Sequence, residues 1–124
     1  MKNLEQIRAT EAFVTARETT KATANRFPAM ILTNGLIAAT AFATEDGGQK
    51  RPRMHVIVGG IARHLSNPEM GFNTFAGCDT PAKFSTALHE SADNSEIQRA
   101  TVEALSFIAY VKRFAQKDED NQED

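Results

Sequence analysis

Apolar residues recur along this chain at steps of three and four, and the clearest such run covers residues 27–43. Pro28 suits the first turn of a helix, where its missing N–H has no intrahelical partner to lose. The Asn34-Gly35 pair is ordinarily a turn signal. Burial of two large neighbours, at about 1.5–3 kcal/mol each, nevertheless outweighs the cost of a glycine in a helix, about 1 kcal/mol. We therefore expect one helix through Gly35, with a second helix crossing closely at that glycine.

The N-terminal segment also predicts a helix, which begins with a capping box at Asn3 and Gln6 and runs to about Asn25. At about 100° per residue, this helix has two apolar sides. One side carries Ala9, Ala12, Phe13 and Ala16, and the opposite side carries Leu4, Ile7 and Val14. Because a helix with two apolar faces contacts two bodies, we expect the second set to form an interface with another protein chain. The alternative is a central helix that is covered on all sides.

The rest of the chain predicts further helices. A flexible loop is expected over residues 45–53, where Gly47-Gly48 interrupts the pattern. Residues 54–65 have helical spacing; the β-branched run 56–58 also suits a buried strand, but no other segment offers a partner strand. Asn67-Pro68 and Thr80-Pro81 are each typical of an N-cap followed by a first-turn proline. Ser95 with Gln98 predicts a capping box for the last long helix.

These elements predict an all-α fold, a compact bundle of about five to six helices. Residues 1–117 form one helical domain, and residues 118–124 form a disordered acidic tail. A length of 124 residues with 41% hydrophobic residues suits a single domain with its own core. The run 27–43 is too short and too polar to span a bilayer. No secretory signal is visible, and the single cysteine, Cys78, excludes an intrachain disulfide, so we expect a cytoplasmic protein.

The net charge of −2 hides an uneven distribution along the chain. Residues 118–124 hold five of the sixteen acids and no base, so the rest of the chain has fourteen bases against eleven acids, a net charge of +3. An acidic tail of this kind usually keeps a protein in solution. It can also imitate nucleic acid by lying over a basic surface when no ligand is bound.

The sequence offers no constellation of residues for catalysis. His55, His64 and His89 lack the spacing of a helical metal site, and Cys78 has no second cysteine with which to complete a zinc site. Each histidine is interpreted as an ordinary surface or half-buried residue. The two glycine pairs lack the lysine and hydroxyl of a phosphate-binding loop. We therefore predict no catalytic residue, no metal and no cofactor.

The basic residues are more informative, because clusters of them can follow a phosphate backbone by charge alone. Three lie in the predicted loop, two are four apart on one face of the predicted first helix, and two more share another direction. One lies at the end of the last helix, where a cation also complements the helix dipole. A solvated surface with local ion pairs is the alternative interpretation. The candidates for binding nucleic acid are Arg8, Arg17, Lys21, Arg26, Lys50, Arg51, Arg53 and Arg113.

Three motifs carry a family resemblance. They are residues 4–9 (LEQIRA), residues 28–36 (PAMILTNGL) with Ala41-Phe42 behind them, and residues 101–105 (TVEAL) leading into residues 112–115 (KRFA). In this order and spacing they resemble the small subunit of the Cmr-type (type III-B) CRISPR–Cas effector complex. The resemblance implies a small all-helical protein without enzymatic activity. It also implies that several copies stack into a filament beside the backbone subunit and along the guide RNA–target RNA duplex, while other subunits cut the RNA.

The residues and the resemblance together predict a non-catalytic subunit of an antiviral complex. Its expected partners are the other Cmr-type subunits, further copies of itself, CRISPR RNA and target RNA, and no membrane. The eight basic candidates are then expected to contact RNA. The alternative is a helical adaptor that binds only protein partners, and a third hypothesis is a small hydrolase that uses His64 or His89.

Overall fold

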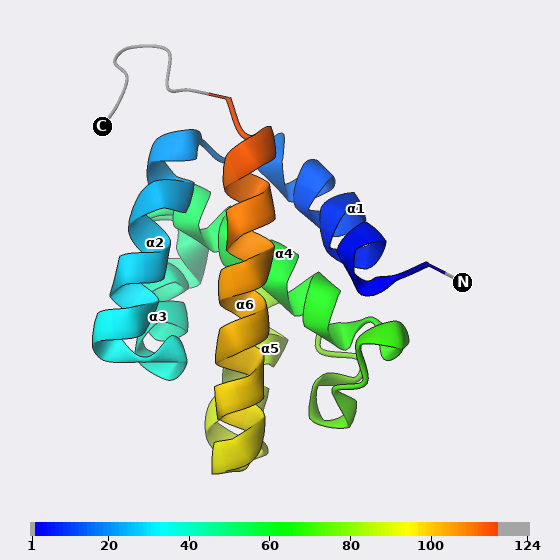
Figure 1. Ribbon diagram of the computed structural model, residues 1–124. Helices are drawn as coiled ribbons and strands as arrows, with labels where there is room; N and C mark the ends of the chain where they lie inside the picture. Colours follow the sequence, from blue (N-terminus) through cyan, green and yellow to red (C-terminus); the bar gives the residue numbers. More distant parts are fainter. Residues whose placement is uncertain (1, 117–124) are drawn as a thin grey trace.

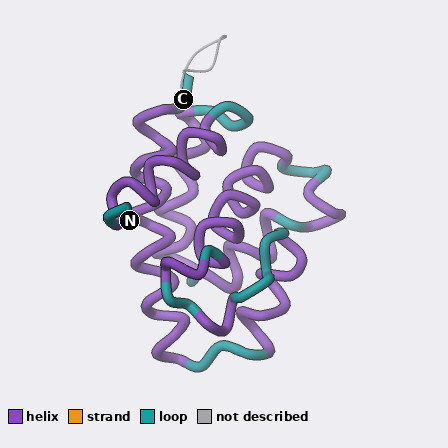
Figure 2. The backbone as a smooth tube through the Cα atoms, turned by 90° about the vertical axis from the view of Figure 1, so that its right-hand side faces the viewer, coloured by secondary structure: helices purple, strands orange, loops and turns teal. Residues whose placement is uncertain are grey.

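A computed structural model describes residues 2–116 and folds them into six α-helices and three short 3-10 helices (Figure 1). In chain order these are α1 (Leu4–Ala16), α2 (Lys21–Asn34), α3 (Leu36–Ala43), η1 (Glu45–Gly48), α4 (Pro52–Ser66), η2 (Pro68–Met70), η3 (Asn73–Phe75), α5 (Pro81–Glu90) and α6 (Asn94–Phe114). Residues 2–116 contain no strand (Figure 2), so the predicted all-α bundle is confirmed. The predicted tail, residues 118–124, lies outside the described residues. No helix within residues 2–116 has both the length and the apolar character of a membrane-spanning segment.

Helix α4 lies at the centre of the bundle. Its residues from Ile57 to Ala62 and its Leu65 are buried, which confirms the helix predicted over residues 54–65. Four fully buried aromatic rings come from other elements: Phe27 of α2, Phe75 of η3, Phe84 of α5 and Phe107 of α6. The long helix α6 packs against α1 and α2 on one side of this core (Figure 1). A single core therefore joins elements from both ends of the chain.

The first helix is shorter than predicted, because a second helix starts within the same segment. Helix α1 has the predicted capping box at Asn3 and Gln6 but ends at Ala16 rather than near Asn25. Thr20 caps α2, and its side chain accepts a hydrogen bond from the backbone N–H of Thr23 at 3.3 Å. A threonine hydroxyl competes in this way with a continuing helix.

The predicted helix over residues 27–43 is wrong at both its start and its middle. Pro28 lies inside α2, where it has no N–H to donate to the preceding turn, and is not a first-turn proline. Gly35 ends α2 and precedes α3, with φ +93° and ψ 157°, a conformation that essentially only glycine adopts. Nothing lies within 4 Å of the position that a Gly35 Cβ would occupy. The turn signal of Asn34-Gly35 therefore prevails, and no helix crosses there.

Two further predictions concern the helix ends. Thr80 and Asn67 cap α5 and η2 as expected, each followed by a proline. The capping box of α6 uses Asp93 and Glu96 instead of Ser95 and Gln98. Residues 45–53, expected as a loop, contain η1 and the first turn of α4, with the buried Gly48 against the side chain of His55.

The close helix crossing that the sequence suggested does occur, but at a different glycine. At Gly60, in the middle of α4, an added Cβ would overlap the side chain of Thr15 on α1. The adjacent Gly59 faces another way: its Cβ would lie 3.5 Å from Nη1 of Arg63, an ordinary contact. Gly60 therefore sets how closely α1 approaches α4.

This pair of glycines generates the first prediction. Gly60→Ala should lower the free energy of unfolding by about 1–3 kcal/mol, because the new methyl group overpacks the crossing. Gly59→Ala is the matched control and should leave stability unchanged or raise it by up to about 1 kcal/mol, because alanine favours a helix. Urea denaturation followed by circular dichroism measures both. Equal stability of the two variants would contradict a close crossing at Gly60.

Candidate functional site

Three of the eight basic candidates line one surface cleft of about 420 Å³ where α2 meets the start of α4. We call this the basic cleft; its lining residues are Thr23, Arg26, Arg51, Pro52, Arg53 and Met54. A hydrogen bond holds the two helix starts together: the hydroxyl of Thr19 donates to the backbone carbonyl of Arg53 at 3.0 Å. Arg26 and Arg53 are exposed, so their charges are accessible to a ligand in this cleft.

Arg51 is held in place by the segment in front of it. Its Nη1 donates to the carbonyl of Phe42 at 3.1 Å and to Oε1 of Glu45 at 2.9 Å, and its guanidinium lies 3.4 Å from the centre of the Phe42 ring. The hydrogen bond from Arg51 lowers the pKa of Glu45. Lys50 lies 3.9 Å from Glu45 and 3.7 Å from Asp46. Acids therefore balance much of the charge of Lys50 and Arg51, and Arg51 has a structural role as well.

Arg17 and Lys21 do not share a helix face, because α1 ends between them and α2. Both instead lie beside the end of α6. The Arg17 guanidinium is 5.0 Å from the centre of the Phe13 ring, which contacts Phe114 edge-on at 5.6 Å. Lys21 donates its Nζ to the carbonyl of Lys112 at 2.8 Å. Arg113 is exposed in this same last turn of α6.

Arg8 lies in a different place from the other bases. Its Nε and Nη2 donate to the two carboxylate oxygens of Glu103 at 2.7 and 2.8 Å. Only 21% of its side chain is exposed. We therefore correct the assignment of Arg8: its guanidinium joins α1 to α6 and is not an accessible phosphate ligand. Arg8 and Arg26, expected to share a direction, belong to separate helices.

Glu103 and His64 form a polar network inside the core that the sequence analysis missed. His64 Nε2 lies 2.8 Å from Oε2 of Glu103, and the imidazole stacks on Phe107 with the ring centres 4.9 Å apart. The His64 side chain is completely buried, and its Nδ1 has no partner among the described residues. The prediction of a surface or half-buried His64 is therefore wrong, and a substrate cannot reach this ring for hydrolysis. The signal was the place of Glu103 in the apolar stripe of α6, next to Ala104.

The network fixes the charge on Glu103. Burial alone would raise the pKa of this carboxyl group, but the hydrogen bonds from Arg8 and His64 outweigh it and hold the pKa at about 2. Glu103 is therefore ionised at neutral pH, and its charge is compensated by Arg8. His89 is exposed and His55 is half-buried. No group of three or more histidine, cysteine or acidic side chains within residues 2–116 is arranged to hold a metal.

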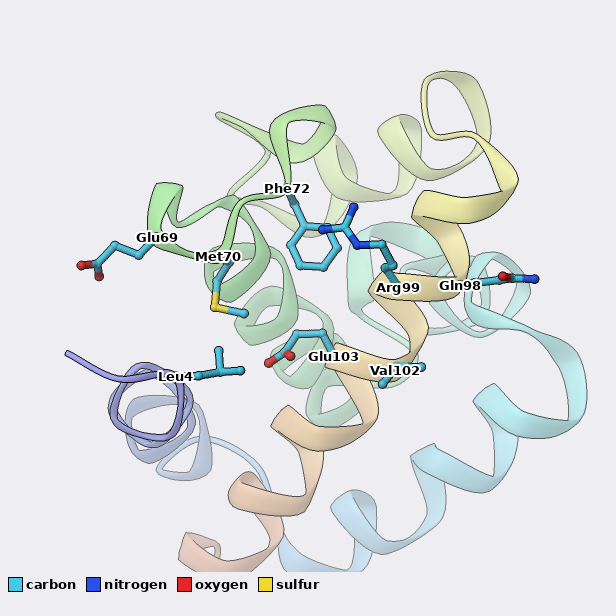
Figure 3. Close-up of a pocket in the computed structure, with 8 residues that line it drawn as sticks. All are labelled: Leu4, Glu69, Met70, Phe72, Gln98, Arg99, Val102 and Glu103. Atoms are coloured by element: carbon cyan, nitrogen blue, oxygen red, sulfur yellow. The ribbon is translucent and has the colours of Figure 1, made fainter. Parts of the chain in front are cut away.

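The three residues of the expected protein interface have separate positions. Ile7 is only 7% exposed and packs inside the bundle, so we remove it from the interface. Leu4 is 45% exposed and lines a cleft of about 640 Å³ between α1, α6 and the segment after α4 (Figure 3). We call this the apolar cleft; its lining residues are Leu4, Glu69, Met70, Phe72, Gln98, Arg99, Val102 and Glu103. The Arg99 guanidinium covers Phe72, 4.6 Å from the ring centre.

Val14 lies at the other end of α1, outside the apolar cleft. It is 49% exposed, as is its neighbour Phe13, and Phe114 of α6 is 41% exposed. The surface around this end of α1 therefore combines exposed aromatic rings with the bases Arg17 and Arg113. Sequence periodicity placed Phe13 on an inward face, so neither phenylalanine was a candidate.

The comparison with family models gives a match over residues 2–118 to the family described as CRISPR-associated protein (Cas_Cmr5). The chain belongs to this family. The Cmr5 family provides the small structural subunit of the type III-B Cmr complex, so the predicted resemblance is confirmed. Comparisons with curated proteins and with solved structures found no match for this Cmr5 chain.

The second prediction concerns the Glu103 network. Because the folded-state pKa of Glu103 lies near 2 and its ordinary value is 4.5, the unfolded chain takes up this proton first as the pH falls. The network should therefore stabilise the protein fully above about pH 4.5. About 3 kcal/mol of this stability should be lost on acidification towards pH 2, at about 1.36 kcal/mol per pKa unit.

Glu103→Gln should lower the free energy of unfolding at neutral pH by about 2–4 kcal/mol, because Arg8 loses a paired charge. It should also remove most of the loss between pH 4.5 and 2. Glu90→Gln is the control, since 64% of the Glu90 side chain is exposed. Denaturant titrations over a pH series measure all three proteins. An acid profile of Glu103→Gln equal to that of the wild type would show that the network does not hold this charge.

Proposed function

We propose that this Cmr5 chain is a non-catalytic subunit that stacks with further copies along the guide RNA–target RNA duplex and contacts the RNA by charge. The observation that carries this proposal is the convergence of Arg26, Arg51 and Arg53 on the basic cleft. These arginines come from separate helices, so the fold assembles a positive surface that no single segment provides. Their contacts would be with phosphate and would be independent of sequence.

The positive charge outside the acidic segment is modest, and this suits a subunit that acts in multiple copies. A net charge of +3 on residues 1–117 supports only weak binding of RNA by one chain. Several copies held along one duplex add their weak contacts, and linked sites gain affinity without any new contact. RNA binding through the basic cleft is therefore expected to depend on assembly.

The apolar surfaces support contact with other subunits. Leu4 and Val102 are exposed on the same cleft, although apolar side chains of this size are usually buried. We propose that the apolar cleft receives a neighbouring subunit, such as the backbone subunit or another copy of this chain. The exposed pair Phe13 and Phe114 offers a second apolar contact.

The adaptor hypothesis has one observation in its favour. Many of the candidate bases already have acceptors within the protein: Arg8 with Glu103, Arg51 with Glu45, and Lys21 with the carbonyl of Lys112. If such pairing extends to the whole surface in the assembled complex, the chain binds protein alone. The experiment below therefore distinguishes RNA contact from assembly.

The third prediction tests the basic cleft. The double variant Arg26→Gln and Arg53→Gln should weaken RNA binding by the assembled complex. Each lost phosphate contact should lower the slope of log K against log salt by about 0.7–0.9. Arg51 is left intact, because it holds the carbonyl of Phe42. The matched control is Lys83→Gln on α5, which removes a charge outside the cleft. Unchanged affinity and unchanged salt slope in an intact complex would favour the adaptor.

The fourth prediction tests the apolar cleft. The double variant Leu4→Gln and Val102→Gln should melt like the wild type, because both side chains are exposed. Its incorporation into the complex should weaken about 10- to 100-fold, the usual effect of removing central apolar contacts. Co-purification with tagged partner subunits measures incorporation. Leu32→Gln is the matched control, a 72% exposed leucine on α2. If only Leu32→Gln impairs incorporation, the interface lies on α2.

A further inference from the structure

The described chain ends next to the basic cleft. The carbonyl of Gln116, the last described residue, accepts a hydrogen bond from the backbone N–H of Lys21 at 3.0 Å. Lys21 also donates its side chain to the carbonyl of Lys112, so two contacts fix the end of the described chain at the start of α2. Arg26 lies five residues further along this helix, about 7.5 Å at 1.5 Å per residue.

A second contact ties the same region to the other side of the cleft. Thr19 directly precedes the α2 cap, and its hydroxyl donates to the carbonyl of Arg53. The start of α2 therefore lies between the chain end at Gln116 and the basic cleft. The eight residues after Gln116 can reach about 26–29 Å when extended, well beyond what this geometry requires.

The charge of these residues complements the cleft. Residues 118–124 carry five carboxylates and no base, and the cleft is lined by three arginines. A segment tethered this closely has an effective concentration of the order of millimolar at a neighbouring site. Weak ion pairs are sufficient to occupy a site at that concentration.

We propose that the acidic segment, residues 118–124, docks in the basic cleft of its own chain and competes there with the phosphates of RNA. The competition rests on the proposed function, whereas the docking itself does not. A docked segment weakens the binding of a single chain to a short, isolated RNA. In an assembled array, the combined contacts of many copies with one duplex displace the segments. The acidic segment thereby directs RNA binding to the assembled complex.

The docking is tested on the full-length chain without RNA. A nitroxide spin label is attached at Gln122→Cys in a Cys78→Ser background, since Cys78 is the single natural cysteine. At about 0.05 M salt, the label should broaden the amide signals of Arg26 and Arg53, and at about 0.5 M salt the signals should recover, because salt screens exposed charges. The amide of Lys83 is the internal control and should stay sharp.

Three outcomes of this measurement would overturn the docking. The first is the absence of broadening at low salt. The second is broadening that persists when Arg26→Gln and Arg53→Gln are introduced, because the cleft charges would not then hold the segment. The third is equal broadening when a labelled chain is mixed with an isotope-labelled chain that has no nitroxide. That result would place the segment on a second copy and not on its own chain.

The competition is tested with a neutralised segment in the full-length chain: Asp118→Asn, Glu119→Gln, Asp120→Asn, Glu123→Gln and Asp124→Asn. This variant should bind a short RNA about three- to tenfold more tightly than the wild type at about 0.05 M salt, and the difference should shrink at higher salt. Equal affinities of the two chains would overturn the competition. If neither chain nor the complex binds RNA while the broadening is present, the proposed function and the competition fail but the docking is supported.

Discussion

The carboxylate of Glu103 joins three helices in the interior of this protein. A buried carboxylate is costly to desolvate, so it is tolerated only when its oxygens accept hydrogen bonds and its charge is balanced. Arg8 of α1 supplies the charge and two hydrogen bonds, and His64 of α4 supplies a third contact. This requirement fixes the rotation of α1 about its own axis against α4 and α6. The positions of Leu4, Phe13 and Val14 on the surface follow from that rotation.

Much of the fold is local chemistry and can therefore be predicted from sequence. Asn3, Thr80 and the prolines beside helix starts were identified correctly, because capping depends on residues three positions apart. The errors occur where two local signals compete. At Gly35 the turn signal of Asn-Gly opposed an apolar run, and the bundle could bury that run as two helices instead of one. No local rule decides such a case.

The candidate site was less predictable, because the role of a base depends on distant neighbours. Arg8 and Arg53 are equivalent as sequence letters, yet Arg8 meets Glu103, 95 residues away, and Arg53 is exposed beside a cleft. The glycine argument shows the same limit. Close approach of helices at a glycine was the correct physical idea, but only the packed structure shows that Gly60, against Thr15, is that glycine.

The tight crossing at Gly60 has a consequence for the geometry of assembly. With α1 pressed against α4 and tied to α6, it acts as a rigid rod that carries one exposed apolar residue near each end, Leu4 and Val14. Ten residues separate them, which corresponds to about 15 Å along the helix and a rotation of about 80° around it. Two neighbours that used these residues would be held at a fixed distance and angle. The helix would then set the pitch between successive subunits as a ruler does.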